Sequence, residues 1–142
     1  MDTYVIRQVS VFSENRPGRL AAIARALQDE KINILAFSIA EADGFGVVRA
    51  LVDKPDKAFG TLGSMGFNVA FTEVIAVKMR DEPGGLYEIA RILGDAQINI
   101  EYSYAYSGKE GAVLILRVDD VQSAIQALLE RGAGIMESSA FQ

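Results

Sequence analysis

Apolar and polar residues alternate along this chain with two different periods, and each period predicts one kind of element. Near the N-terminus, Val5, Val9 and Val11 fall on one face of an extended chain. Gln8 and Ser10 fall on the opposite face. This period of two predicts a β-strand.

Elsewhere the apolar residues recur at the helical spacing i, i+3, i+4 and i+7, which places them on one stripe of a helix. The first such set is Leu20, Ile23, Ala24 and Leu27. Asn15 is a suitable cap for this helix, and Pro17 suits its first turn, where a missing N–H costs nothing. The polar residues 29–31 end it.

The elements predicted in this way follow the same order in both halves of the chain. In the first half we expect strands at 4–12, 32–40, 45–52 and 67–71, with helices at 17–28 and 55–65. In the second half we expect strands at 72–79, 98–106, 111–118 and 135–140, with helices at 84–95 and 120–131. The predicted class is α+β: two tandem ferredoxin-like βαββαβ repeats with antiparallel sheets, each with both helices on one face.

The two halves are copies of one unit, offset by 66 residues without a gap. Between residues 17 and 34, eleven of the eighteen positions are identical to their counterparts. Since a lone unit of this size buries a modest core, two packed copies are physically sensible. We predict domains at residues 1–70 and 71–142.

The second predicted strand changes the phase of its apolar positions. Ile32 and Ile34 are followed by Leu35, Phe37 and Ile39. Either a β-bulge shifts the phase or both faces are covered; we favour cover, by the sister repeat or by a second chain. A second chain would most simply form a two-fold homodimer.

The corresponding strand of the second repeat carries a row of tyrosines, Tyr102, Tyr104 and Tyr106. The row suits an aromatic packing surface, which we favour. A ligand wall is the alternative, because tyrosine offers both apolar area and a hydroxyl.

Composition excludes several function classes. The chain has no cysteine and no histidine, so it has no thiol chemistry, no imidazole base and neither of the commonest nitrogen and sulfur metal ligands. Its net charge of −5 disfavours nucleic acids and anionic membranes as partners. No apolar run is long enough to span a bilayer, and the N-terminus lacks a signal-peptide pattern. We expect a cytoplasmic, non-catalytic protein that needs no cofactor and no metal ion.

The repeated stretch that is best suited to bind a ligand is a loop that leads into a helix N-terminus. It comprises residues 15–20, here called the first loop, and residues 81–86, the second loop. A helix start presents unpaired N–H groups and a partial positive charge, which suit a carboxylate. Asn33 and Asn99 begin the next strand and offer donor and acceptor atoms. This combination suits a small zwitterion such as a free amino acid, although Pro-Gly is also a common structural turn.

The loop with Pro-Gly and Leu, two helical turns, and Ile-Asn-Ile resembles the ACT domain, a small regulatory module that binds amino acids. The resemblance covers the whole chain as two tandem repeats. It implies association through sheets or edges, with effectors bound at domain–domain interfaces. ACT modules usually sit beside an enzyme domain, so the chain is more similar to free-standing tandem ACT proteins.

The ligand-binding positions implied in the first repeat are Asn15, Arg16, Pro17, Gly18, Arg19, Leu20, Asn33 and Ile34. Those in the second are Asp81, Glu82, Gly84, Gly85, Leu86, Asn99 and Ile100.

The two loops differ in charge. The first loop carries Arg16 and Arg19, whereas the second has Asp81 and Glu82, with Gly85 in place of Arg19. We expect tighter anion binding at the first loop, because like charges at close range disfavour an anion at the second. We also expect Gly85 to leave space for a ligand to approach the backbone.

The predicted function is regulation of amino-acid metabolism, through a partner such as a metabolic enzyme, by a protein that binds a small amino acid or related carboxylate. One alternative is a protein-interaction module with a vestigial ligand site. An RNA-recognition domain shares the topology, but residues 43–48 lack its basic and second aromatic residues, and the chain is acidic. Acylphosphatases share it too, but residues 13–19 lack their glycine-rich phosphate cradle.

Overall fold

The computed structural model describes residues 2–109 and 111–142, in two compact units. The N-terminal unit is Arg7–Thr72 together with Phe141–Gln142. The C-terminal unit is Glu73–Ala140 together with residues 2–6. Both are βαββαβ-like, with antiparallel strands and two helices each, so the predicted α+β ferredoxin-like fold is confirmed.

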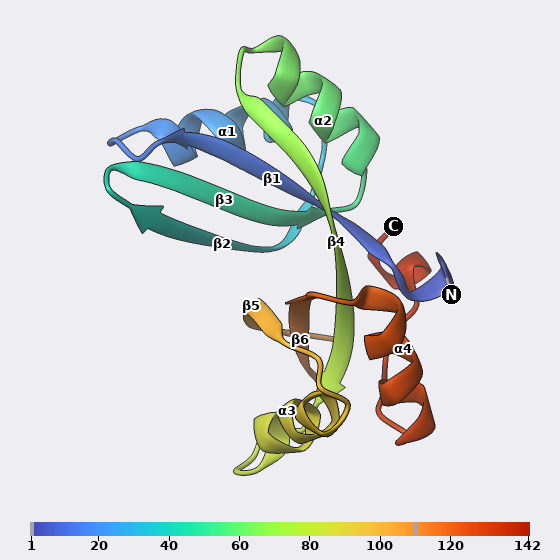
Figure 1. Ribbon diagram of the computed structural model, residues 1–142. Helices are drawn as coiled ribbons and strands as arrows, with labels where there is room; N and C mark the ends of the chain where they lie inside the picture. Colours follow the sequence, from blue (N-terminus) through green and yellow to red (C-terminus); the bar gives the residue numbers. More distant parts are fainter. Residues whose placement is uncertain (1, 110) are drawn as a thin grey trace. The chain divides into compact units, whose positions relative to one another are not determined.

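The N-terminal unit follows the predicted order of elements closely. Its elements are β1 (Ile6–Glu14), α1 (Arg19–Asp29), β2 (Ile34–Ala42), β3 (Phe45–Val52), α2 (Pro55–Ser64) and the first part of β4 (Asn68–Met79). The strand order is β2-β3-β1-β4. Within this unit, α1 and α2 lie on the same side of the strands (Figure 1).

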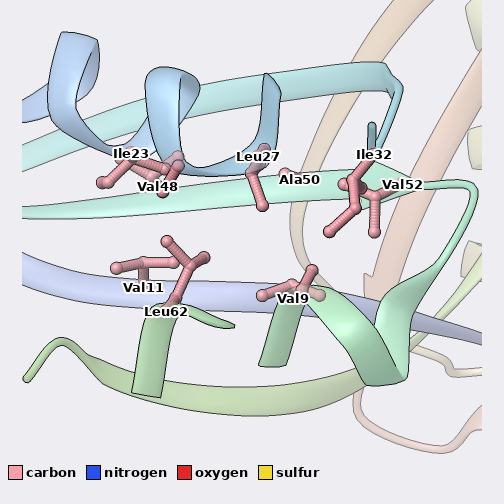
Figure 2. Close-up of a cluster of buried hydrophobic side chains, with 11 residues drawn as sticks. Val9, Val11, Ile23, Leu27, Ile32, Val48, Ala50, Val52 and Leu62 are labelled. Atoms are coloured by element: carbon pink, nitrogen blue, oxygen red, sulfur yellow. The ribbon is translucent and has the colours of Figure 1, made fainter. Parts of the chain in front are cut away.

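The core of this unit lies between those helices and one face of the sheet. Ile23 and Leu27 of α1 lie over Val48 and Ala50 of β3, as Figure 2 shows. The other side chains of the cluster come from β1, α1, the segment after α1, β3 and α2: Val9, Val11, Ala26, Ile32, Val52, Ala58 and Leu62. The predicted helical stripe therefore does face the sheet, although Leu20 at its N-terminal end stays 37% exposed.

The C-terminal unit repeats this arrangement with one difference at its end. Its elements are the second part of β4, α3 (Gly85–Asp95), β5 (Ile100–Gly108), β6 (Gly111–Val118), α4 (Val121–Glu130) and, up to Ala140, the short 3-10 helix η2 (Ser138–Phe141). The strand order is β4-β6-β5, and α3 and α4 pack on a core that includes Ile89, Leu93 and Ile125.

The prediction of a strand at 135–140 is wrong. Only an isolated bridge between Val77 and Ile135 forms there. The Lys78 N–H donates to the Gly134 carbonyl at 2.9 Å, and the Met136 N–H donates to the Ala76 carbonyl at 2.8 Å. The chain then turns into η2, because the polar residues after Met136 do not continue an extended segment.

The middle and the start of the chain also differ from the prediction. The strands expected at 67–71 and 72–79 are one continuous strand, β4, because no glycine or proline interrupts the β-forming residues between them. The start of the chain forms the 3-10 helix η1 (Asp2–Tyr4) rather than strand. Val5, expected beside Val9 and Val11, packs with Tyr4 against the core of the C-terminal unit.

A β-bulge, and not cover of both faces, explains the phase change in β2. The register of β2 against β3 shifts between Ile34 and Ala36, which makes Leu35 the extra residue. The same shift separates Ile100 from Tyr102 in β5. The cover that we favoured is therefore not needed for the phase change. Phe37 and Ile39 remain 50% and 42% exposed on the edge strand.

The described part of the chain contains no helix that is both long enough and apolar enough to cross a membrane.

Candidate functional site

Both loops are tight turns that place a glycine directly before the helix. The Arg19 N–H donates to the Arg16 carbonyl at 3.1 Å across Pro17 and Gly18, and Gly18 has φ 91° and ψ −13°. Proline followed by a glycine with positive φ is typical of a type II turn. The second loop repeats this turn, with the Gly85 N–H bonded to the Glu82 carbonyl and Gly84 at φ 96°.

Asn15 does not cap the helix, contrary to the prediction. Gly18 occupies the N-cap position and no side chain bonds to the first turn of α1. Asn15 instead ties the first loop to the β2–β3 turn, because its N–H donates to the Gly44 carbonyl at 2.9 Å. Its side chain lies over Gly46, where an added Cβ would stand 3.3 Å from the Cβ of Asn15.

Beside the first loop lies a recess of about 20 Å³. It brings together three of the predicted residues, Asn15, Arg19 and Leu20, and adds Ile39 and Gly46 from β2 and β3. A cavity of about 10–15 Å³ holds one water molecule. The recess of a single chain is therefore too small to enclose an amino acid.

The two arginines of the first loop differ in whether an ion pair already compensates their charge. Arg16 Nε lies 3.1 Å from the Glu14 carboxylate, so its charge is compensated. Arg19 is half-buried and forms no ion pair with any residue in the described ranges. The first loop therefore offers one uncompensated cation and not the two that the sequence suggested.

The second loop is closed by its own side chains. Arg80 pairs with both Glu82 and Glu88, and its Nε lies 3.2 Å from Glu88 Oε2. Arg80 and Glu82 occupy the positions of Glu14 and Arg16, so the ion pair is inverted between the repeats. Asp81 and Leu86 are exposed.

Gly85 does not leave space for a ligand, contrary to our expectation. It is buried, and an added Cβ would overlap the carbonyl oxygen of Arg80. The backbone of the protein itself fills the space that the missing side chain leaves.

Asn33 and Asn99 each belong to a repeated backbone clamp. The Asn33 N–H donates to Asp53 Oδ1 at 2.9 Å, and the Asp53 N–H returns a bond to the Asn33 carbonyl. Asn99 and Asp119 repeat both bonds. Both asparagines are exposed, whereas Ile34 and Ile100 are half-buried and pack against the two cores.

Within one unit, the structure does not bring Asn33 to the first loop. Glu14 pairs with Phe45 at one end of β3, and Ile34 pairs with Val52 at the other end. The seven steps between them correspond to about 23 Å of strand. Asn99 and the second loop stand at opposite ends of β6 in the same way. Each predicted set of ligand residues is therefore split in two.

The tyrosine row lies on the face of β5 that is opposite the helices. Tyr102, Tyr104 and Tyr106 pair with Arg117, Ile115 and Val113 of β6. All three rings are half-buried, and burial raises the pKa of the Tyr106 phenol above its ordinary value of 10.0. Across the described ranges, no group of three or more Asp and Glu side chains could hold a metal ion.

Sequence reasoning missed the contributions of Ile39 and Gly46 to the recess, and the part that Arg80 plays in the second loop. The sequence pattern identifies Ile39 only as an apolar residue that another surface should cover. The signal available for Arg80 was the inversion of Glu14 and Arg16 between the repeats, which is visible once the copies are aligned.

Comparison with known proteins places this arrangement in a family. The family model described as an ACT domain pair matches residues 4–140. A solved structure from Bacteroides thetaiotaomicron is similar over 98% of this chain and 96% of its own, at 32% identity and a TM-score of 0.92. No curated protein matches the chain.

Two more distant structures share the fold. The regulatory subunit of aspartate kinase from Thermus thermophilus, in its ligand-free form, matches 89% of this chain and 93% of its own, at 15% identity and a TM-score of 0.64. The regulatory subunit of aspartate kinase from Thermus flavus matches 90% and 96%, at 15% identity and a TM-score of 0.58. With the family model covering nearly all of its length, the chain belongs to the ACT domain pair family.

Proposed function

We propose that this protein is a non-catalytic regulator that binds a small amino acid or a related carboxylate at its first loop. The site is completed by a second copy of the chain, and occupancy modulates amino-acid metabolism through a partner protein. The observation that carries the proposal is the uncompensated Arg19 beside the start of α1.

The first loop suits a carboxylate for two reasons. The first turn of α1 receives no side-chain cap, so it presents backbone donors and the positive end of the helix dipole. Arg19 adds a guanidinium that can bond both oxygens of a carboxylate. Both features lie on the N-terminal unit, at one end of its sheet.

The small size of the recess argues for a second wall. At about 20 Å³ it encloses too little space for an amino acid, although Leu20 and Ile39 offer apolar surface at its rim. A surface from another molecule would enclose the ligand and exclude water, which strengthens the charge interactions.

Pairing of β2 with β2 of a second copy supplies such a wall. β2 is the edge strand of the N-terminal unit's sheet. Antiparallel pairing about a two-fold axis brings the start of one β2 beside the end of the other. The exposed Asn33 of one copy would then approach the first loop of its partner, since that loop is tied to the β2–β3 turn through Asn15 and Gly44. The partner's amide can bond the ligand's ammonium or carboxylate group.

The second loop has no comparable role in this proposal. Its arginine is already paired with two carboxylates, and its glycine is packed against the backbone. An incoming carboxylate would meet Asp81, Glu82 and Glu88. We therefore infer one amino-acid site per chain, at the first loop.

The inference that the protein acts on a partner enzyme is based on similarity of fold. Two proteins of this fold are named regulatory subunits of aspartate kinase, an arrangement in which the regulatory chain acts on an enzyme. The chain itself has no histidine or cysteine for nucleophilic or acid–base chemistry of the usual kind. We infer that it too acts through a partner.

A second candidate is an interaction module whose ligand site is vestigial, which the small recess favours. Thermal-shift screening against the common amino acids and their 2-keto acids separates the two. A ligand at about a hundred times its Kd adds about 2.7 kcal/mol, a rise of roughly 5–10 °C in Tm. No rise with any compound at millimolar concentration would leave the interaction module as the better account.

The screen has a matched pair of variants. Arg19→Met removes the uncompensated charge but keeps most of the stem, so we expect it to abolish the shift. Arg16→Met removes a charge already paired with Glu14, so the shift should persist.

A further inference from the structure

The C-terminal unit contains a cavity of about 410 Å³. Of the ligand-binding residues predicted from the sequence, only Gly85 lines it. Its walls are the end of β4, one side of α3 and the segment 131–134 that follows α4. Its volume is within the range of about 300–1,000 Å³ that small-molecule sites occupy.

The cavity is lined by more cationic than anionic side chains. Lys78, Arg80, Arg91 and Arg131 all line it, against the single carboxylate of Glu88. Its floor is apolar, because Met79, Ile89 and Ile92 reach it from the core. A ligand with several negative charges on a small carbon skeleton would match both surfaces.

Two of these arginines are incompletely satisfied. Arg91 Nε and Arg131 Nη1 both approach one oxygen, Oδ2 of Asp95, at 3.7 Å and 3.4 Å. Good charge-assisted bonds between guanidinium and carboxylate groups measure about 2.7–2.9 Å. Two guanidiniums thus share one carboxylate at long range, and among these three residues one positive charge stays uncompensated.

Arg80 is different, because it pairs with both Glu82 and Glu88, so its charge is compensated. Lys78 stands at the rim with its aliphatic stem against Gly134, where an added Cβ would lie 3.2 Å from the Cβ of Lys78. The cavity is thus lined by positioned cations from three separate segments.

The sister repeat provides an internal comparison. Its corresponding groove is lined by Arg25 and by two acids, Asp29 and Glu30, and Met65 occupies the position of Arg131. The cationic lining is therefore a feature of the C-terminal unit and not of the repeat.

We propose that this cavity is a second binding site, for a small polyanion that carries phosphate or several carboxylate groups. Guanidinium groups bond the paired oxygens of either group through two parallel N–H donors. Arg91 of α3 and Arg131 of the segment after α4 bind the anion together, and the apolar floor holds its carbon skeleton. This site is independent of the amino-acid site at the first loop.

Calorimetry on the full chain with two probes, inorganic pyrophosphate and citrate, tests the proposal and distinguishes phosphate from carboxylate. We expect saturable binding of at least one probe. Arg91→Gln and Arg131→Met should each weaken it by about tenfold or more, because each removes a charge-assisted bond. Both side chains are about half exposed, 58% and 48%, so both variants should fold.

The matched control is Arg25→Gln, which makes the same change at the equivalent position of the other repeat and should bind like the wild type. Three results would overturn the proposal. The first is no binding of either probe at millimolar concentration, and the second is an equal loss in Arg25→Gln. The third is loss with Arg19→Met but not with Arg91→Gln, which would place the anion at the first loop. Failure of amino acids to bind would leave this test unaffected.

Discussion

Two adjacent glycines at the start of α3 are fixed by different physical constraints. Gly84 has φ 96°, a left-handed conformation that the turn requires and that other residues rarely adopt. Gly85 has no such backbone requirement; it is constrained by packing against the Arg80 carbonyl. The first loop needs only the first constraint, because Arg19 occupies the position of Gly85 there.

The first prediction concerns Gly85. We expect Gly85→Ala to destabilise the protein by about 1–3 kcal/mol, because the added methyl would overlap a backbone carbonyl that cannot rotate away. Urea denaturation measures the change in the free energy of unfolding.

Gly94 in the same helix is the control for this variant. A Cβ there meets no atom within 4 Å, so Gly94→Ala should stabilise by roughly 0.5–1 kcal/mol. If both variants unfolded like the wild type, the close packing of Gly85 on Arg80 would be wrong.

At the residue scale, sequence comparison between the repeats identified the two turns but not the contacts that their side chains make. The Pro-Gly turns and the different charges of the two loops could be predicted from residues 15–20 and 81–86. The pairing of Arg16 with Glu14 could not, because it depends on side-chain geometry at the end of β1. The burial of Gly85 likewise depends on how the turn places the Arg80 carbonyl.

At the scale of elements, equivalent helices begin differently in the two repeats. Asp120 caps α4: its carboxylate accepts the Ser123 hydroxyl at 2.7 Å and the Ser123 N–H at 3.1 Å. These bonds, the hydroxyl bond first, lower the pKa of Asp120 below its ordinary value of 3.8. The equivalent residue of α2 is Lys54, which makes no side-chain cap bond.

The second prediction follows from that lowered pKa. A carboxyl whose pKa is depressed by folding stabilises the protein above its unfolded pKa, and this stability is lost as the pH falls through the folded pKa. We therefore expect Asp120→Ala to unfold more easily than the wild type at neutral pH. The difference should shrink as the pH falls below 3.8.

Chemical denaturation at several pH values provides the measurement, and Lys54→Ala provides the control. Lys54 makes no side-chain cap bond, so its substitution removes no cap and should show no such change with pH. A difference for Asp120→Ala that stayed constant down to the lowest pH would contradict the capping role.

The bulge in β2 illustrates what a pattern of apolar positions leaves open. The shift from Ile34 to Leu35 and Phe37 was visible in the sequence, but a bulge and a doubly covered strand produce the same pattern. The equivalent shift in β5 was hidden, because Glu101 and Tyr102 follow Ile100 there. The prediction of a strand at 135–140 was wrong for a related reason. Apolar content alone does not reveal that pairing with β4 ends after a single bridge at Ile135.

At the scale of the whole molecule, the proposed ligand site requires that two copies associate through β2. The register with β3 places Phe37 and Ile39 on the same face as Ala50 and Val48, toward α1. They are 50% and 42% exposed in the single chain. An exposed, apolar edge strand favours pairing with another chain.

The third prediction is that Phe37 and Ile39 hold the dimer together. The equivalent residues of β5 are Ser103 and Ala105, so the double variant Phe37→Ser, Ile39→Ala gives β2 the side chains of its sister strand. We expect the wild type to sediment as a dimer, and the double variant to shift to monomer at micromolar concentration.

Leu129→Ser is the control, since Leu129 is 41% exposed on α4 and takes no part in β2 pairing. It should leave the dimer intact. A wild type that remained a monomer at every concentration would remove the second wall of the proposed ligand site.

The split of the ligand residues is also a property of the whole molecule. Sequence similarity assigned the first loop and Asn33 to one site, but β1 and β2 both run antiparallel to β3, so the end of one and the start of the other lie at opposite ends of the sheet. Residue patterns name the members of a site without saying which copy supplies each member.

Complementation between two inactive variants tests whether the first loop and the Asn33 of one site come from different copies. Arg19→Met damages the first loop, and Asn33→Ala removes the amide that the partner is proposed to supply. Each variant alone should bind the ligand found in the thermal-shift screen weakly or not at all. In a mixed dimer, however, one site combines the intact loop of one copy with the intact Asn33 of the other.

The measurement is calorimetric titration of an equimolar mixture of the two variants, after subunit exchange, against each variant alone. Random pairing makes about half of the dimers mixed, each with one intact site of two, so about a quarter of the wild-type sites should return with wild-type affinity. If Arg19 and Asn33 act within the same copy, or if Asn33 takes no part, the mixture will show only the average of its two components.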